Sequence, residues 1–100
     1  MYAYTVGMQF QSAPCRLHWQ HWLLEEHLRD VLRAGALRAE LVELSETALE
    51  ARYLFADADA YAAYERDHAP RLRAEGLRKA TETGAVTFVR STGVLHRVAT

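Results

Sequence analysis

The first ten residues alternate between bulky apolar and smaller or polar side chains. Apolar or aromatic residues occupy every second position from Tyr2 to Phe10, with alanine, threonine, glycine and glutamine between them. A period of two is that of a β-strand, in which successive side chains point to opposite faces. The pattern therefore predicts an N-terminal strand with one apolar face.

After a break at residues 11–14, the spacing becomes helical. We predict a helix from about Arg16 to Ala34, closed by Gly35, because glycine readily adopts the conformation that ends a helix. Two apolar lines run along this helix about a quarter turn apart. One consists of Leu17, Leu24, Leu28 and Leu32, and the other of Trp19, Leu23, His27 and Val31. We expect one line to cover the sheet and the other to meet the second helix or a partner.

Two more alternating runs, residues 37–42 and 49–55, predict a β-hairpin. A three-residue loop at residues 45–47 would place Glu40 opposite Arg52, whereas a two-residue loop would place two glutamates opposite each other. Opposite charges across a strand pair favour the first register by about a few tenths of a kcal/mol. We therefore predict the three-residue loop.

A second helix is predicted from near Ala58, with Asp57 or Asp59 as its cap. Its aromatic and apolar residues recur at spacings of three and four. Pro70 interrupts the pattern, because proline lacks an N–H group and clashes with the preceding turn. We expect a kink there, or a restart with Pro70 in the first helical position, followed by helix to about Lys79.

A last strand is predicted from Ala85 to about Val98, with Gly93 marking a bulge. The resulting order, strand, helix, strand, strand, helix, strand, indicates an α+β, ferredoxin-like βαββαβ fold. It contains a four-stranded antiparallel sheet with two helices on one face. Residues 1–100 have enough interior for one hydrophobic core, so we predict a single domain.

The larger apolar strand residues should face the helices. The expected core residues are Tyr4, Val6, Met8, Leu41, Tyr53 and Phe55. The opposite face carries small, polar and apolar residues together, including Thr5, Gly7, Val42 and Leu54. We call this the mixed face. A second copy of the same face would cover it around a two-fold axis, so we predict a homodimer.

Charge and composition exclude several classes of protein. With 12 basic and 13 acidic residues, the chain has no excess of positive charge for nucleic acid. Its first residues lack the basic and apolar regions of a signal peptide, and no stretch is apolar enough to span a membrane, so we predict no membrane partner and a cytoplasmic location. The single Cys15 fits a reducing compartment. It would need His18 as a base to act as a nucleophile, and an inert thiol is the better interpretation.

Three ordered motifs resemble a family of uncharacterised small bacterial proteins, a domain of unknown function. The motifs are Trp19-x-x-Trp22-Leu23-x-x-Glu26-His27, Tyr61-x-x-Tyr64-x-x-x-His68-Ala69-Pro70 and Phe88-x-Arg90. The resemblance covers about residues 2–98 and implies the fold of the dimeric α/β barrel superfamily. Two positions depart from the family pattern: Arg29 replaces a usual proline, and Gly76 replaces a further histidine. The family has no assigned activity, so the resemblance implies a fold and candidate positions only.

In relatives from this superfamily, small substrates lie between the helices and the sheet. By that resemblance, the candidate binding residues are Trp19, Trp22, His27, Tyr61, Tyr64, His68 and Arg90. A histidine there could act as a general base, since its usual pKa lies near neutrality. It could equally be a packing residue with satisfied hydrogen bonds.

Arg90 lies in the middle of a strand, where a buried charge needs a partner. We expect it to pair with Glu26, Glu75 or a carboxylate of a partner chain, and the alternative is that it holds a substrate carboxylate. The arginines between Arg66 and Arg78 alternate with acidic residues and are interpreted as a solvated helix face.

Metal and cofactor motifs are absent. His18 and His21 lie on adjacent helical turns, but no third ligand accompanies them, so we predict no metal. The sequence contains no glycine-rich phosphate loop and no nucleophile elbow, and we predict no cofactor. Three hypotheses for function remain: a homodimer that binds a small molecule in an aromatic and histidine pocket, a cofactor-independent monooxygenase- or lyase-like enzyme with His27 or His68 as base, and a structural or interaction protein.

Overall fold

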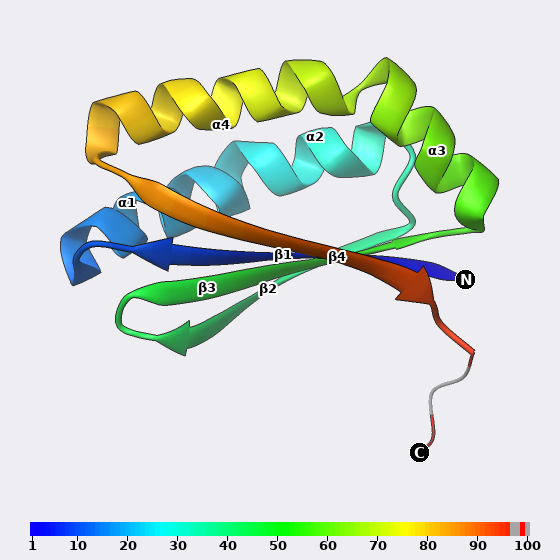
Figure 1. The fold of residues 1–100 in the computed structure, drawn as a ribbon, viewed down its shortest axis with the longest axis horizontal. Coiled ribbons are helices and arrows are strands. Elements are labelled where there is room, and N and C mark those ends of the chain that lie inside the picture. Colours follow the sequence, from blue (N-terminus) through cyan, green and yellow to red (C-terminus); the bar gives the residue numbers. More distant parts are fainter. Residues whose placement is uncertain (97–98, 100) are drawn as a thin grey trace.

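The strands form one antiparallel sheet in the order β2-β3-β1-β4, in a computed structural model that describes residues 1–96 and 99. The strands are β1 (Tyr2–Phe10), β2 (Arg38–Ser45), β3 (Ala48–Phe55) and β4 (Val86–Val94). All helices cover the same face of this sheet, and the other face is left open (Figure 1). The chain therefore has the predicted ferredoxin-like fold.

The first helical layer is one continuous run with a wider turn in its middle. It consists of α1 (Ala13–Trp22), the π-helical turn η1 (Leu23–His27) and α2 (Leu28–Arg33). The run begins earlier than predicted because the Ser12 hydroxyl caps it, accepting a hydrogen bond from the Cys15 amide at 3.2 Å. Pro14 is tolerated in the first turn, where no N–H donor is needed. Gly35, with φ of 122°, ends the run as predicted.

The second helical layer is divided into α3 (Ala58–Asp67) and α4 (Ala69–Thr83). Asp57 caps α3, accepting a hydrogen bond from the Ala60 amide at 2.8 Å. The chain leaves helical geometry at His68, so the proline produces a restart and not a kink. Pro70 takes the second helical position and not the first, and α4 continues beyond the predicted end at Lys79.

The hairpin has the predicted pairing but not the predicted loop. Glu40 lies opposite Arg52, as the charge argument predicts. However, Ser45 pairs with Ala48, which leaves a two-residue loop, and the register shifts between Glu43 and Ser45. This β-bulge absorbs one residue, so the charged pair meets without a three-residue loop.

The last strand differs from its prediction in two ways. β4 pairs with β1 in unbroken register, and Gly93 lies opposite Ala3, so the predicted bulge at Gly93 is wrong. The strand also ends at Val94, with Leu95 and His96 outside it, whereas the predicted end at Val98 lies outside the described residues.

The core forms between the sheet and the helices. The predicted core residues that are buried are Tyr4, Val6, Met8, Tyr53 and Phe55. Leu41 is only partly buried because β2 is an edge strand. In the first helix, the line that covers the sheet is the one containing Trp19, Leu23 and Val31, all nearly inaccessible.

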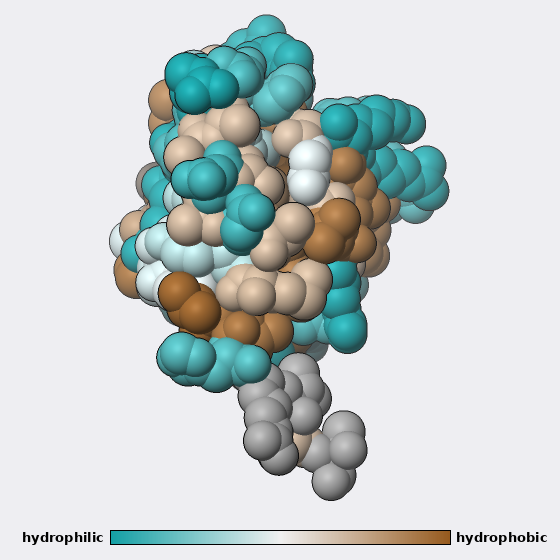
Figure 2. Space-filling view, turned by 90° about the vertical axis from the view of Figure 1, so that its right-hand side faces the viewer, coloured by the Kyte–Doolittle hydropathy of each residue, from teal (hydrophilic) through white to brown (hydrophobic). Residues whose placement is uncertain are grey.

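The second apolar line of that helix meets neither a strand nor a helix along most of its length. Leu17, Leu24 and Leu32 are exposed, and only Leu28 is buried. Other apolar side chains also reach the surface, among them Val94 at the end of β4. Figure 2 views this end of the molecule and shows hydrophobic surface interspersed with hydrophilic side chains.

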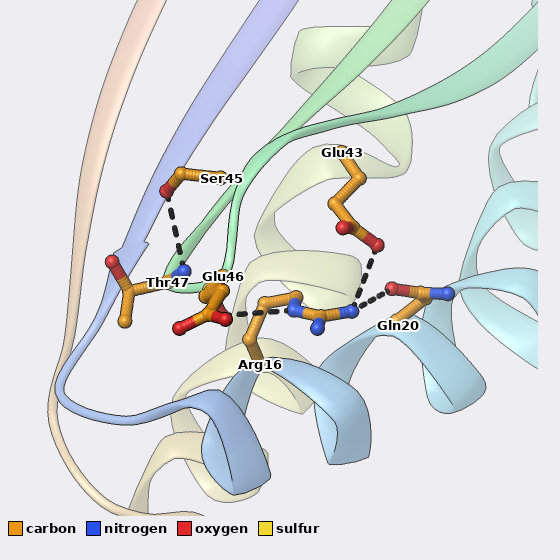
Figure 3. A network of polar contacts seen from close by, with 6 residues as sticks. All are labelled: Arg16, Gln20, Glu43, Ser45, Glu46 and Thr47. Atoms are coloured by element: carbon orange, nitrogen blue, oxygen red, sulfur yellow. Dashed lines mark hydrogen bonds and ion pairs between the residues drawn. The ribbon is translucent and has the colours of Figure 1, made fainter.

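Arg16 joins the helical layer to the hairpin. Its guanidinium is buried and donates hydrogen bonds to the Glu46 carbonyl at 3.0 Å, to the Glu43 carboxylate at 3.0 Å and to the Gln20 amide oxygen (Figure 3). A buried guanidinium needs such partners, because an unpaired charge in the interior is strongly destabilising. The network therefore holds α1 against the end of β2.

Candidate binding site

A cavity of about 230 Å³ lies between the helices and the sheet. Its sheet side is formed by Tyr4, Val6, Met8, Ala51, Tyr53, Phe88 and Arg90. Its helix side is formed by Trp19, Trp22, Leu23, His27, Tyr64, Leu72, Arg73, Gly76 and Leu77. Most of this lining is aromatic or aliphatic, with a few polar groups, which is the usual make-up of a small-molecule site.

The π-helical turn brings Trp22 and His27 onto the same side of the helix. In a regular α-helix, residues five apart point about 140° from each other. The wider π turn reduces this angle, and such turns are frequent at functional sites. The two rings consequently stack, with centroids 4.8 Å apart, and Trp22 meets the buried Trp19 edge to face at 5.3 Å.

His27 is a neutral ring in this cavity. Burial lowers the pKa of His27 from 6.5 to about 4, although the nearby Asp30 carboxylate opposes the effect. Its Nδ1 atom is buried and has no hydrogen-bond partner among the residues that the structure describes. Leaving a buried polar atom without a partner lowers the stability of a protein by about 1–3 kcal/mol. A ligand atom that bonded this nitrogen would recover that cost, so Nδ1 is an unused hydrogen-bonding position of the cavity.

Arg73 belongs to the cavity and not to the solvated helix face predicted for the arginines of this segment. It donates to the Glu65 carboxylate and contacts the Tyr4 hydroxyl at 3.4 Å. Its Nε atom is buried, and none of the described residues accepts a hydrogen bond from it. One signal in the sequence could have identified it: Arg73 is four residues after Ala69 and three before Gly76, and both of these are buried.

Glu65 is held between Arg73 and Tyr61. Burial works to raise the pKa of Glu65, but hydrogen bonds from the Tyr61 hydroxyl and from Arg73 outweigh burial and keep this pKa below its usual value. The carboxylate therefore stays ionised near neutral pH. The neighbouring Tyr64 stays neutral, because burial raises its pKa to about 12.

The structure brings together five of the seven candidate residues predicted from the sequence. Trp19, Trp22, His27, Tyr64 and Arg90 line the cavity. Tyr61 and His68 do not line it. Tyr61 instead packs against Tyr2 and Tyr4 and bonds Glu65. His68 lies where α3 ends and α4 begins, so it does not continue the cavity-facing side of either helix.

Arg90 forms neither of the two ion pairs predicted within the chain, and the predicted pairing with a carboxylate of a partner chain stays a prediction. Among the residues that the structure describes, neither Glu26 nor Glu75 pairs with it, and its guanidinium lies over the Phe88 ring at 5.1 Å. Arg90 is exposed because β4 is an edge strand whose second half carries little cover. It is a cation at the border of the cavity and not a buried charge.

Other candidate chemistry finds little support. Within residues 1–96 and 99, no group of three or more histidine, cysteine or acidic side chains could hold a metal ion. Both His18 and His21 are exposed, and the Cys15 thiol is buried and free. In the same part of the chain, none of the helices has the length and apolarity to cross a membrane.

Solved structures share this fold over nearly the whole chain. A dimeric ferredoxin-like protein from an uncultured marine organism has a TM-score of 0.71 and 13% identity, over 99% of this chain and 97% of its own. SnoaB, a cofactor-independent oxygenase from Streptomyces nogalater, has a TM-score of 0.71 and 13% identity, over 97% and 94%. The ActVA-Orf6 monooxygenase of Streptomyces coelicolor, solved with Nanaomycin D, has a TM-score of 0.66 and 14% identity, over 99% and 92%.

These identities establish a common fold and nothing finer. No family model and no curated protein sequence matches the chain. The resemblance of the three motifs to the uncharacterised family is therefore not confirmed. The ferredoxin-like fold, by contrast, is confirmed by both the strand order and the solved structures.

Proposed function

We propose that the chain binds a small, flat, largely apolar molecule in the cavity between its helices and its sheet. The observation that carries this proposal is a cavity of about 230 Å³ walled by aromatic rings and containing a buried, unpartnered His27 nitrogen. A well-packed core leaves few voids larger than a water molecule. The ActVA-Orf6 monooxygenase, which has the same fold, was solved with a small molecule bound.

Binding is better supported than catalysis. A general base works best when its pKa lies near the working pH, whereas the pKa of His27 is lowered to about 4. His68, the other candidate base, does not line the cavity. The enzyme neighbours support an oxygenase function through the fold alone, and one fold supports many functions.

Gly76 provides a direct test of the cavity. It lines the cavity, and an added Cβ would meet only Trp19 Cη2, at 3.9 Å. Gly76→Leu should fill the cavity without loss of stability, because glycine is unfavourable inside a helix by about 1 kcal/mol. Gly76→Ala is the matched control, since it changes the helix equally and fills little space.

We expect phenols and aromatic acids of one and two rings to shift the indole N–H NMR signals of Trp19 and Trp22. The shifts should occur in the wild type and in Gly76→Ala and disappear in Gly76→Leu. If no compound shifts these signals in the wild type, or if Gly76→Leu responds like Gly76→Ala, the cavity is not a binding site.

We also propose that the chain forms a homodimer through the mixed face of its sheet. That face stays open on the side away from the helices (Figure 1). Val89, which pairs with Gly7 on this face, is 69% exposed. A similar ferredoxin-like protein is itself described as dimeric. Two copies of one face related by a two-fold axis would form a self-complementary interface.

Light scattering at micromolar concentration should give about twice the chain mass of 11.4 kDa. Val89→Asp should reduce this to a monomer, because it would bury an unpaired charge in each half of the interface. Leu24→Asp, at an exposed position on the helical layer, should remain a dimer. A wild-type mass of one chain would refute the proposal, and so would dissociation by Leu24→Asp alone.

A further inference from the structure

We infer that the molecule bound in the cavity carries an anionic oxygen, as in a carboxylate or phenolate, and that Arg73 and Arg90 hold this oxygen. This inference rests on the proposed function, because it names the chemical class of the ligand for the same site. It follows from the charge of the lining, the geometry of Arg73 and the position of Arg90.

The charged side chains among the described residues that line the cavity are all positive. Of the described residues that line the cavity, the charged ones are Arg73 and Arg90, and none is acidic. The remaining polar groups are neutral: burial keeps His27 uncharged and raises the pKa of Tyr64. Two cations beside apolar walls favour an anion, because charge interactions are stronger where water is excluded.

The carboxylate nearest to these arginines does not cancel their charge. Glu65 does not line the cavity, and its carboxylate accepts hydrogen bonds from Tyr61 and Arg73. The cluster of Glu65, Arg73 and Arg90 contains one carboxylate and two guanidinium groups, so it keeps a net positive charge. Glu65 instead orients Arg73, since a side chain held by one hydrogen bond loses less freedom when it forms another.

One N–H donor of Arg73 is available to a ligand. Its Nη2 atom donates to Glu65 and Tyr4, whereas its Nε atom is buried and has no acceptor within residues 1–96 and 99. Guanidinium nitrogens are donors only, so this position requires an acceptor atom. A carboxylate or phenolate oxygen is the strongest acceptor that a small aromatic molecule can offer.

Arg90 provides the second cation at the border of the cavity. Its guanidinium lies over the Phe88 ring and is exposed. The same positive charge acts to lower the pKa of both Tyr64 and Glu65, so its field reaches the Arg73 cluster. An anion that entered beside Arg90 would therefore be attracted on its path to Arg73.

Matched probes test this inference. Benzoate, benzamide and benzylamine share one ring and differ in charge, and 2-naphthoate with 2-naphthamide repeats the comparison with two rings. The carboxylate should bind about tenfold or more tightly than its amide, in line with a hydrogen bond between charged groups. The ammonium compound should bind most weakly.

Variants assign the preference to residues. Arg73→Met should remove most of the preference for benzoate over benzamide, because the loss of the guanidinium weakens binding of the charged acceptor more than binding of the neutral one. Arg71→Met is the matched control, because Arg71 is an exposed arginine of the same helix and lies outside the cavity lining. If Arg73→Met fails to fold without its pairing to Glu65, Arg90→Met, which breaks no ion pair with any described residue, should still reduce the preference about threefold or more.

The outcomes separate the two proposals. If none of these compounds binds, the proposed function fails. If the amides bind as tightly as the acids, the cavity is a binding site but the anion inference is wrong. Tighter binding of benzylamine would also overturn it, as would an unchanged benzoate preference in both Arg73→Met and Arg90→Met.

Discussion

Trp19→Ala is expected to lower the free energy of unfolding by about 3–5 kcal/mol, the usual range for truncating a core tryptophan. The Trp19 ring is 1% exposed. It contacts Phe10 and Phe88 at centroid distances of 5.8 and 5.7 Å, and its indole N–H donates to the Thr83 hydroxyl at 2.9 Å. Truncation would remove these contacts and leave the Thr83 hydroxyl without this donor.

Trp22→Ala is the matched comparison, since Trp22 lies one helical turn further along and is only partly buried. It borders the cavity and stacks on His27, so its removal enlarges an existing space. We expect a cost of about 1–2 kcal/mol. Urea denaturation followed by circular dichroism gives both values. Equal midpoints for the two variants would contradict the assignment of Trp19 to the core.

The stability of the protein should fall between pH 6.5 and pH 4, in part because of His27. In the unfolded chain His27 takes up a proton below its usual pKa of 6.5, whereas burial lowers its pKa in the folded protein to about 4. The unfolded state binds more protons in this range. The contribution of His27 to stability is therefore fully present above pH 6.5 and is lost as the pH falls towards 4. We expect this residue to account for about 2–3 kcal/mol, allowing for its partial exposure.

His27→Gln should remove this contribution, because glutamine does not titrate. Its free energy of unfolding should therefore fall less than that of the wild type between pH 7 and pH 4, as measured by urea denaturation at each pH. His21→Gln changes an exposed histidine of the same helix. Its free energy of unfolding should fall as steeply with decreasing pH as that of the wild type. Parallel pH profiles for the wild type and His27→Gln would show that the ring is not buried as a neutral group.

The sequence was sufficient for the features that depend on nearby residues. Alternation places Tyr4 and Val6 on the buried face of β1, and both are buried. Asp57 begins one helix through its side chain and Gly35 ends another through its backbone, so Gly35 could be predicted from position and the cap could be narrowed to Asp57 or Asp59. The pairing of Glu40 with Arg52 was also predictable, because opposite charges favour one register of a short hairpin.

Part of the candidate site was predictable for the same reason. Trp19 and His27 lie on one apolar line of the first helix, and that spacing is visible in the sequence. The π-helical turn that stacks Trp22 on His27 is not visible there, because regular spacing assumes an α-helix throughout. Nor could the spacing show which of two apolar lines covers the sheet, since both have the same period.

Only the tertiary structure decided the surroundings of the charged groups of the site. Arg73 contacts Tyr4, which is 69 residues away in the chain, and this contact depends on how α4 lies across the sheet. Arg90 is exposed because β4 forms an edge that the helices cover only in part. Local patterns determine the elements and their buried faces, since those depend on neighbours a few residues apart. The environment of a charge depends instead on groups brought together by folding, so Arg73 became visible as part of the site only in three dimensions, whereas Arg90 was already a candidate by resemblance.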